Sequence, residues 1–272
     1  MQNKKISACL VVYHEEKVIE RCLKSIQGLV DEVIVVHDGP CTDQTIEIAK
    51  KYTDKIFIRD HVGIMEAHLV FAFEQAQGEW IFRIDADEYV DTADFQKIKD
   101  RIEDKEVDAL ILKWELWNGK KVITFPGLQK MCLVRREHFH YRGIPHENGS
   151  VDGRIEKLDI FLHHRPVYNN IAWKNFMRKT RQWVPVHASY FFPEERSFSC
   201  FNATPDAWLQ HTEKVRRYIW YYVLIEPIKM SLGQLKNGLW RSRYGWQVVL
   251  ERSVYYGMLY GQIKRRMNSK KA

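Results

Sequence analysis

The N-terminal third of the chain alternates between short apolar runs and amphipathic stretches, and this alternation limits the folds that it can adopt. Apolar runs typical of buried strands lie at residues 6–13, 32–36, 55–58 and 80–84. Stretches with helical periodicity follow the first three runs, at residues 18–26, 44–52 and 68–77. This order predicts an α/β fold with a mostly parallel central sheet and helices on both of its faces.

Polar side chains follow each of the four predicted strands. They lie at residues 13–16, at Asp38, at residues 59–61 and at residues 85–88. Because ligands of parallel sheets bind beyond the carboxyl ends of the strands, we expect these groups to line one crevice. Neither a G-x-G-x-x-G motif nor a P-loop motif is present, so a diphosphate in this crevice would need a metal ion.

The fourth strand ends in a cluster of carboxylates. Asp85 and Asp87 stand two residues apart, which on a strand places both side chains on the same side. Such a pair can hold Mg²⁺ or Mn²⁺ through its oxygens. An acidic cluster after a strand is more often a solvated turn or a helix cap, and the residues alone leave both interpretations open.

Three segments together resemble glycosyltransferase family two, whose nucleotide-sugar-binding fold is called GT-A. They are Val-Val-Tyr-His-Glu-Glu from residue 11, Val-Ile-Val-Val-His-Asp-Gly-Pro-Cys-Thr-Asp-Gln-Thr from residue 33, and Gly-Glu-Trp-Ile-Phe-Arg-Ile-Asp-Ala-Asp-Glu from residue 78. The resemblance covers residues 6–90 in order and spacing. It implies an inverting, metal-dependent hexosyltransferase that uses a nucleoside-diphosphate sugar, with a UDP-sugar as the expected donor.

The resemblance also implies roles for individual residues. The nucleotide-sugar site would comprise Val12, Tyr13, Glu15, Asp38, Arg83, Asp85, Ala86 and Asp87. Asp85 and Asp87 would form the D-x-D pair that holds a Mn²⁺ or Mg²⁺ cofactor. Leu69-Val70 stands where such proteins often have Arg-Asn, and His37 and Pro40-Cys41 are also unusual, so the donor sugar stays open.

Two histidine-containing segments follow in residues 91–170. The pair His146-Glu147 is by default a surface feature, but bacterial lipopolysaccharide-core transferases have such a pair here, which implies Glu147 as the general base. The resemblance further implies His164 or His146 as a third metal ligand. Two interfacial histidines with backbone hydrogen bonds are an equal alternative. Arg165 is a candidate to balance the diphosphate charge.

The C-terminal part is helical, basic and aromatic. We expect a GT-A catalytic domain over residues 1–170, with a nucleotide-sugar half (1–90) and an acceptor half (91–170), and a helical extension over 171–272. Helices are predicted at 171–186, 205–225 and 246–266, with a turn at 233–245. Residues 207–272 carry 13 Lys and Arg against 3 Glu, whereas the preceding residues carry 29 against 32 acidic ones.

This composition fits two kinds of partner. An anionic membrane surface would attract a basic, aromatic helical region. Alternatively, the aromatic residues pack on the protein itself or on a second subunit, which would make a homo-oligomer. Nucleic-acid motifs are missing, so no nucleic-acid partner is expected.

Further expectations concern location. The five cysteines have no C-x-x-C spacing, so they suggest neither a zinc site nor a disulfide framework. Apolar stretches of membrane-spanning length and a signal peptide are also missing. We therefore expect a cytoplasmic protein that attaches peripherally to the inner face of the membrane.

The predicted acceptor is a hydroxyl of a glycan or lipid-linked glycan of the cell-surface polysaccharide or lipopolysaccharide type. Two other functions remain: a nucleotidyltransferase acting on sugar phosphates, and a non-catalytic glycan-binding or membrane scaffold protein. The first would have a glycine-rich basic loop after the first strand, where residues 13–16 are acidic instead. The second could dispense with the acidic pair.

Overall fold

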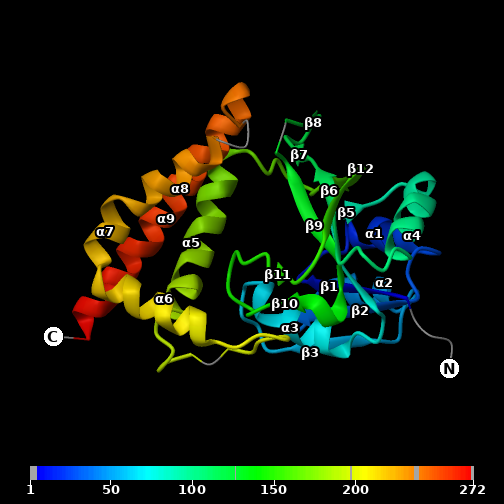
Figure 1. Cartoon of the computed structure of the whole chain (residues 1–272), viewed down its shortest axis with the longest axis horizontal. Coiled ribbons are helices and arrows are strands. Elements are labelled where there is room, and N and C mark those ends of the chain that lie inside the picture. The colour runs from blue at the N-terminus through cyan, green and yellow to red at the C-terminus, as the bar shows by residue number, and fades with distance from the viewer. Residues whose placement is uncertain (1–4, 126, 197, 236–238, 271–272) are drawn as a thin grey trace. The chain divides into compact units, whose positions relative to one another are not determined.

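The computed structural model describes residues 5–125, 127–196, 198–235 and 239–270. The chain forms two compact units, which we call the sheet unit and the helical unit (Figure 1). The sheet unit comprises Met1–Val122, Gln129–Asn170 and Ser199–Ala203, and the helical unit comprises Ile123–Leu128, Ile171–Phe198 and Thr204–Ala272. The main division therefore falls at residue 170. Two short segments are exceptions: residues 123–128 belong to the helical unit and residues 199–203 to the sheet unit.

The sheet unit contains an eight-stranded sheet in the order β3-β2-β1-β4-β9-β6-β12-β5. Its strands are β1 (Ile6–Val12), β2 (Glu32–Asp38), β3 (Ile56–Arg59), β4 (Trp80–Arg83), β5 (Glu88–Tyr89), β6 (Ala109–Trp114), β9 (Gln129–Arg135) and β12 (Ile155–His164). The first four strands pair in parallel, as do β6 and β12. Strand β9 lies antiparallel between β4 and β6, and β5 lies antiparallel to β12. The predicted mostly parallel sheet is confirmed.

Helices cover both faces of this sheet because its central strands are apolar on both sides. In β1, Ile6, Ala8, Leu10 and Val12 join the core cluster that includes helix α1 (Ile19–Ile26). The alternate residues Cys9 and Val11 join the cluster that includes helix α3 (Glu66–Gln75). The remaining helices of this unit are α2 (Thr45–Ala49) and α4 (Phe95–Ile102).

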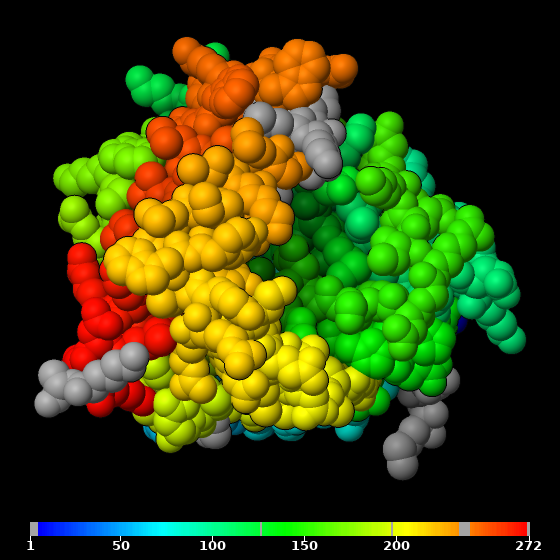
Figure 2. Space-filling view, turned by 60° about the vertical axis from the view of Figure 1, so that its left-hand side comes forward, coloured from blue at the N-terminus to red at the C-terminus, as the bar shows by residue number. Residues whose placement is uncertain are grey.

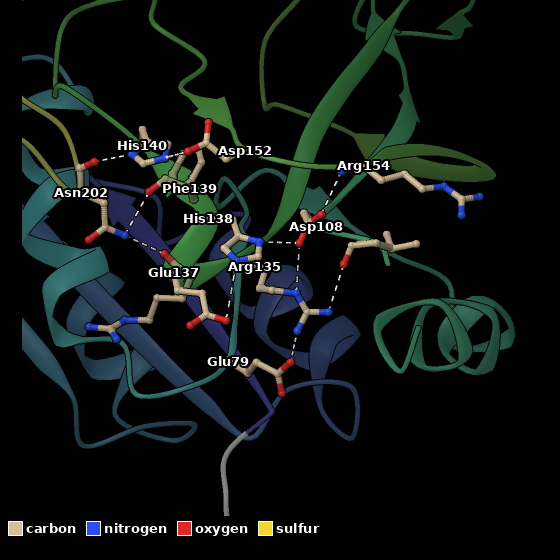
Figure 3. A network of polar contacts seen from close by, with 12 residues as sticks. Glu79, Asp108, Arg135, Glu137, His138, Phe139, His140, Asp152, Arg154 and Asn202 are labelled. Atoms are coloured by element: carbon tan, nitrogen blue, oxygen red, sulfur yellow. Dashed lines mark hydrogen bonds and ion pairs between the residues drawn. The ribbon is translucent and has the colours of Figure 1, made fainter. Parts of the chain in front are cut away.

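A polar network holds the amino-terminal edge of β4 and β6 (Figure 3). Asp108, just before β6, accepts hydrogen bonds from His138 Nδ1 at 2.5 Å and from the Arg154 amide at 2.9 Å. Arg135, at the end of β9, forms an ion pair with Glu79 and lies 4.9 Å from the ring centre of Trp80. These contacts fix β9 between its neighbours at the edge opposite to Asp38 and Asp85.

Short elements complete the sheet unit. After β6, the strands β7 (Leu116–Trp117) and β8 (Val122–Ile123) form a two-stranded sheet. Strands β10 (Phe139–His140) and β11 (Ser150–Val151) form a second two-stranded sheet.

The helical unit consists of α5 (Trp173–Ser189), α6 (Asp206–Arg217), α7 (Ile219–Leu224), α8 (Glu226–Leu235) and α9 (Arg243–Ser269). Buried aromatic and aliphatic side chains form its core, among them Phe191, Tyr222, Leu259 and Ile263. The predicted turn at 233–245 is wrong at its start, because α8 continues to Leu235. Pro227 did not prevent this helix, since it lies in the first turn, where the missing N–H has no helical partner.

Candidate functional site

Asp38, the last residue of β2, organises the carboxyl edge of the sheet. Its carboxylate accepts hydrogen bonds from the amides of Val62 and Gly63 at 2.6 and 2.8 Å and from His68 Nε2 at 2.8 Å. Burial raises the pKa of Asp38, but these hydrogen bonds outweigh burial and hold its pKa below the ordinary value. The charged carboxylate therefore positions the loop that leads into α3.

Tyr13 presents an aromatic surface beside Asp38. It follows β1, is 44% exposed, and its ring centre lies 4.0 Å from that of His14 and 4.7 Å from that of His61. Val12 is buried, and the Glu15 amide donates to Thr45 Oγ1 at 2.7 Å, which fixes the turn into α1. Flat aromatic groups of this kind suit stacking against a planar ligand such as a nucleoside base.

A largely buried lysine pairs with the first aspartate of the acidic cluster. Lys130 Nζ, from the second residue of β9, lies 2.9 Å from Asp85 Oδ2 and 2.7 Å from Glu88 Oε2. Burial lowers the pKa of Lys130, but the charges of both carboxylates outweigh burial and raise it. Burial raises the pKa of Asp85, but the positive charges of Lys130 and Arg83 outweigh burial and lower it below its ordinary value. The pKa of Glu88 is raised, because burial and the negative charge of Asp85 both favour its protonated form.

The second aspartate meets a histidine from β12. Asp87 Oδ2 lies 3.2 Å from His164 Nε2, and the His164 ring stacks on Trp114 with ring centres 4.4 Å apart. His164 Nδ1 lies 3.3 Å from the Glu115 carbonyl oxygen, which can only accept, and 3.4 Å from Asn170 Nδ2, which can donate. In the tautomer that donates to the carbonyl oxygen, Nε2 presents a lone pair to Asp87, and a proton or a cation then lies between them. In the other tautomer, Nε2 donates a hydrogen bond to Asp87.

This pair fits a divalent cation. A carboxylate and an imidazole with its other nitrogen hydrogen-bonded to the backbone are a common ligand set, and Mg²⁺ or Mn²⁺ can take its remaining ligands from phosphate oxygens. Asp85 Oδ1 is also buried without a hydrogen-bond partner among the described residues. However, Asp85 Oδ2 is engaged by Lys130, and within the described ranges Asp85, Asp87 and His164 do not form a group with all ligand atoms inside 4.8 Å.

Of the two histidines left open by the sequence, only His164 contacts Asp87 in the part of the chain that the structure describes. The His146 amide donates instead to Glu66 Oε1 at 2.9 Å, and the residue has a left-handed φ of 62°. His146 therefore belongs to the loop beside the start of α3.

Glu147 lies in the same loop with both carboxylate oxygens occupied. Its Oε1 accepts from Arg142 Nε at 2.7 Å, and its Oε2 accepts from the Arg142 amide at 3.2 Å. The loop contacts α3 closely, since a Cβ atom at Gly143 would lie 3.0 Å from Val70 Cγ2. To accept a proton from a ligand, Glu147 would have to exchange part of its contact with Arg142.

The two arginine candidates differ in their partners. Arg165 is expected to balance a diphosphate, and its Nη1 lies 2.5 Å from Glu115 Oε2, so its guanidinium already has a counter-charge in this structure. Arg83 is half-buried, and its Nε has no hydrogen-bond partner among the described residues. Arg83 precedes Asp85 by two residues and is the better placed cation, while Ala86 between the aspartates is buried.

Lys130 is the site residue that the sequence analysis missed. A signal was present, because Lys130 directly precedes the apolar run Met131, Cys132 and Leu133, which lies in β9. Lysine is almost never fully buried unless it is paired, so its position in a central strand indicated acidic partners.

We predict that Lys130→Met lowers the free energy of unfolding by about 3 kcal/mol, because it leaves the fully buried Glu88 and the partly exposed Asp85 without their counter-charge. Urea denaturation measures this loss. Lys97→Met is the matched control: Lys97 pairs with Asp94 at 2.7 Å on the exposed surface, and its loss should leave stability unchanged. Equal effects of the two substitutions would show that the Lys130 cluster is not desolvated.

Comparisons with known proteins add to this geometry. Residues 7–193 match the family described as Glycosyl transferase family 2. A Rickettsia typhi protein named an uncharacterized glycosyltransferase is 36% identical over 237 residues, covering 79% of this chain and 78% of the relative. A Rickettsia felis protein with the same designation is 35% identical over 279 residues, covering 89% and 96%.

Two solved structures also match. Staphylococcus aureus TarS 1-349 in complex with UDP-GlcNAc has a TM-score of 0.47 at 17% identity, covering 96% of this chain and 92% of that chain. Glucosyl-3-phosphoglycerate synthase from Mycobacterium tuberculosis in complex with Mn²⁺ and UDP-glucose has a TM-score of 0.46 at 18% identity, covering 68% and 78%.

Proposed function

Because the chain belongs to glycosyl transferase family 2, we propose that it moves a sugar from a UDP-sugar to a hydroxyl of a glycan or lipid-linked glycan, with inversion at the sugar. The observation that carries the site assignment is the contact of Asp87 with His164 at the carboxyl edge of the sheet. Family membership favours this function over a nucleotidyltransferase or a non-catalytic scaffold.

Donor binding is assigned to groups at the ends of β1, β2, β4 and β12. Tyr13 stacks on the base, while Asp38 holds the loop of Val62 and Gly63 in place around it. Asp87 and His164 would hold a Mn²⁺ or Mg²⁺ ion, which when bound offsets the negative charge that develops on the departing diphosphate. Arg83 adds a fixed positive charge nearby, and Lys130 keeps Asp85 oriented.

Acceptor activation is assigned to Glu147. It removes the proton of the attacking hydroxyl, and Arg142 is the partner that it exchanges for the acceptor. A carboxylate held by one arginine is positioned before the acceptor arrives, which limits the entropy lost in the reaction.

We predict that Asp87→Ala abolishes transfer without changing the fold, since Asp87 supplies a ligand at a strand end. His164→Ala should weaken Mn²⁺-dependent UDP binding by at least about tenfold, the lower end of the loss seen when only an outer partner of a metal ligand is removed. Release of UDP from the UDP-sugar donor measures transfer, and calorimetric titration of UDP with Mn²⁺ and with EDTA measures binding. The matched control is His163→Ala, because His163 faces Glu115 and Asp91.

An Asp87→Ala enzyme that turns over at the normal rate would contradict the assignment of Asp87. If His163→Ala and His164→Ala weakened UDP binding equally, the effect would belong to the end of β12 and not to a metal ligand.

We predict that Glu147→Gln retains donor binding but loses transfer rate by a factor of roughly 10² to 10⁴, the range for a removed general base. The amide is nearly the same size but cannot take the proton. Single-turnover rates at saturating donor, together with the UDP-sugar affinity, separate the two roles. An equal loss of donor affinity would make Glu147 a binding residue.

The helical unit carries a second proposed function, attachment to an anionic membrane. Large apolar side chains are exposed along α7 and α8 at helical spacing: Tyr221, Leu224, Ile225, Ile228 and Leu232, each 41–59% exposed. Figure 2 shows these helices, in yellow to orange, uncovered on one face. An exposed apolar stripe of this size marks an interaction surface.

Aromatic and basic side chains accompany the stripe. Trp220, Trp240 and Trp246 are each more than half exposed, and Lys264 Nζ lies 3.1 Å from the ring centre of Trp220. Lys229 and Arg217 are exposed on α8 and α6. Apolar and cationic groups on one surface favour the interface of anionic lipids over an uncharged partner. None of the helices in the described ranges has the length and apolarity to cross a bilayer.

We predict that the protein floats with anionic vesicles at low salt and is released at high salt, because the attraction is screened over about 8–10 Å at physiological ionic strength. Ile228→Glu should abolish flotation. Val167→Glu is the matched control, since Val167 is 62% exposed in the sheet unit. A wild-type protein that ignores anionic vesicles at low salt but sediments as a dimer would assign the stripe to a homo-oligomer interface.

A further inference from the structure

The loop after β2 gathers a second group of metal-binding side chains, distinct from Asp87 and His164. A ring nitrogen of His37, Cys41 Sγ and a carboxylate oxygen of Asp43 all lie within 4.8 Å of one another, the one such group of three among the described residues. A tight turn at Gly39 brings them together: its φ is +100°, and a Cβ atom there would lie 2.8 Å from His61 Cβ.

The hydrogen bonding of His37 leaves a buried lone pair. His37 Nδ1 lies 2.6 Å from the Gly39 carbonyl oxygen, and because a carbonyl only accepts, Nδ1 carries the ring proton. The lone pair of the neutral ring is then on Nε2, which has no hydrogen-bond partner among the described residues although His37 is completely buried. A ring that donates to a backbone carbonyl through one nitrogen and leaves the other free has the arrangement of a metal-bound histidine.

Cys41 and Asp43 supply complementary groups at the surface side. The Cys41 thiol donates to Asp43 Oδ1 at 3.3 Å. Asp43 is held rigidly, because it also accepts from the Thr45 amide at 3.0 Å and from the Glu16 amide at 3.3 Å. Burial raises the pKa of Asp43, but hydrogen bonds from Thr45, Cys41 and Glu16 outweigh burial and lower it to about 2, so the carboxylate is charged at neutral pH.

We propose that His37, Cys41 and Asp43 bind a thiophilic divalent cation of the Zn²⁺ type. A thiolate, an imidazole and a carboxylate are the ligands that Zn²⁺ selects, whereas Mg²⁺ and Mn²⁺ favour oxygen ligands. Binding releases the thiol proton to solvent, and the cation takes its place between Cys41 and Asp43. Zn²⁺ bonds are about 2.0–2.3 Å long, so ligand atoms that lie within 4.8 Å of one another must move closer together to share one ion.

The location of this site connects it to the nucleotide. His37 directly precedes Asp38, and the ring centres of His37 and Tyr13 lie 5.9 Å apart. A bound ion would hold the loop from Gly39 to Asp43 beside the proposed base-binding surface. The ion site itself does not depend on the proposed transfer reaction, because its ligands are complete without a donor.

Cobalt tests the site directly, since a Co²⁺–thiolate bond gives a charge-transfer band in the near ultraviolet that oxygen ligands do not give. Metal-free, reduced protein carrying Asp87→Ala is titrated with Co²⁺ and then with Zn²⁺. We expect the band to appear with Co²⁺ and to vanish as Zn²⁺ displaces it. The Asp87→Ala background removes the other cation site from the measurement.

Cys41→Ser should abolish the band and weaken Zn²⁺ binding by at least about tenfold, as for a lost partner of a metal site. Cys200→Ser is the matched control, because Cys200 is also a partly exposed free cysteine. Circular dichroism verifies that both variants fold. A titration without the band, or a band that Cys41→Ser leaves intact, would overturn the proposal.

Discussion

The buried ion pair of Lys130 with Asp85 and Glu88 is the interaction on which the arrangement of the site depends. Removing three charged groups from water is costly, and the cost is offset only when the charges lie within hydrogen-bond distance of each other. Strand β9 meets this condition by entering antiparallel between β4 and β6. The pair thus joins the acidic end of β4 to the second half of the sheet, and Trp114 on β6 completes it by donating to Glu88 at 2.7 Å.

This pairing divides the acidic cluster into two roles. Asp85 and Glu88 face inward and neutralise a lysine, whereas Asp87 faces the end of β12 and His164. The two-residue spacing therefore does not make the aspartates equivalent. A fixed internal cation beside the cluster also limits the net negative charge that a bound metal ion and diphosphate would meet.

The two proposed cation sites differ in their ligand chemistry although both lie at the carboxyl edge of the sheet. At Asp87 and His164, a carboxylate and the bound phosphates would supply the oxygens that a hard cation favours. At the loop after β2, Cys41 adds a sulfur ligand and His37 a buried lone pair. The two sites would therefore select different ions because of their ligand atoms: oxygen ligands favour Mg²⁺ or Mn²⁺, and a sulfur ligand favours Zn²⁺.

The sequence by itself determined the elements that depend on local periodicity. Continuous apolar runs predicted β1 and β2, the 3.6-residue repeat predicted α1, and the order of strands and helices implied the parallel sheet with Asp38 and Asp87 at its carboxyl edge. The family-like motifs pointed to the same edge. These elements can be predicted from the sequence because residues close together in the chain specify them.

Only the tertiary structure decided which distant groups meet. The antiparallel entry of β9, the contact of Asp87 with His164, and the ion pair of Arg165 with Glu115 all depend on pairing between strands far apart in sequence. The same holds for the grouping of His37, Cys41 and Asp43, which the missing C-x-x-C spacing had argued against, and for the stripe on α7 and α8. Periodicity indicates whether a side chain is buried or exposed. Which distant side chain it contacts depends on strand register and turn geometry.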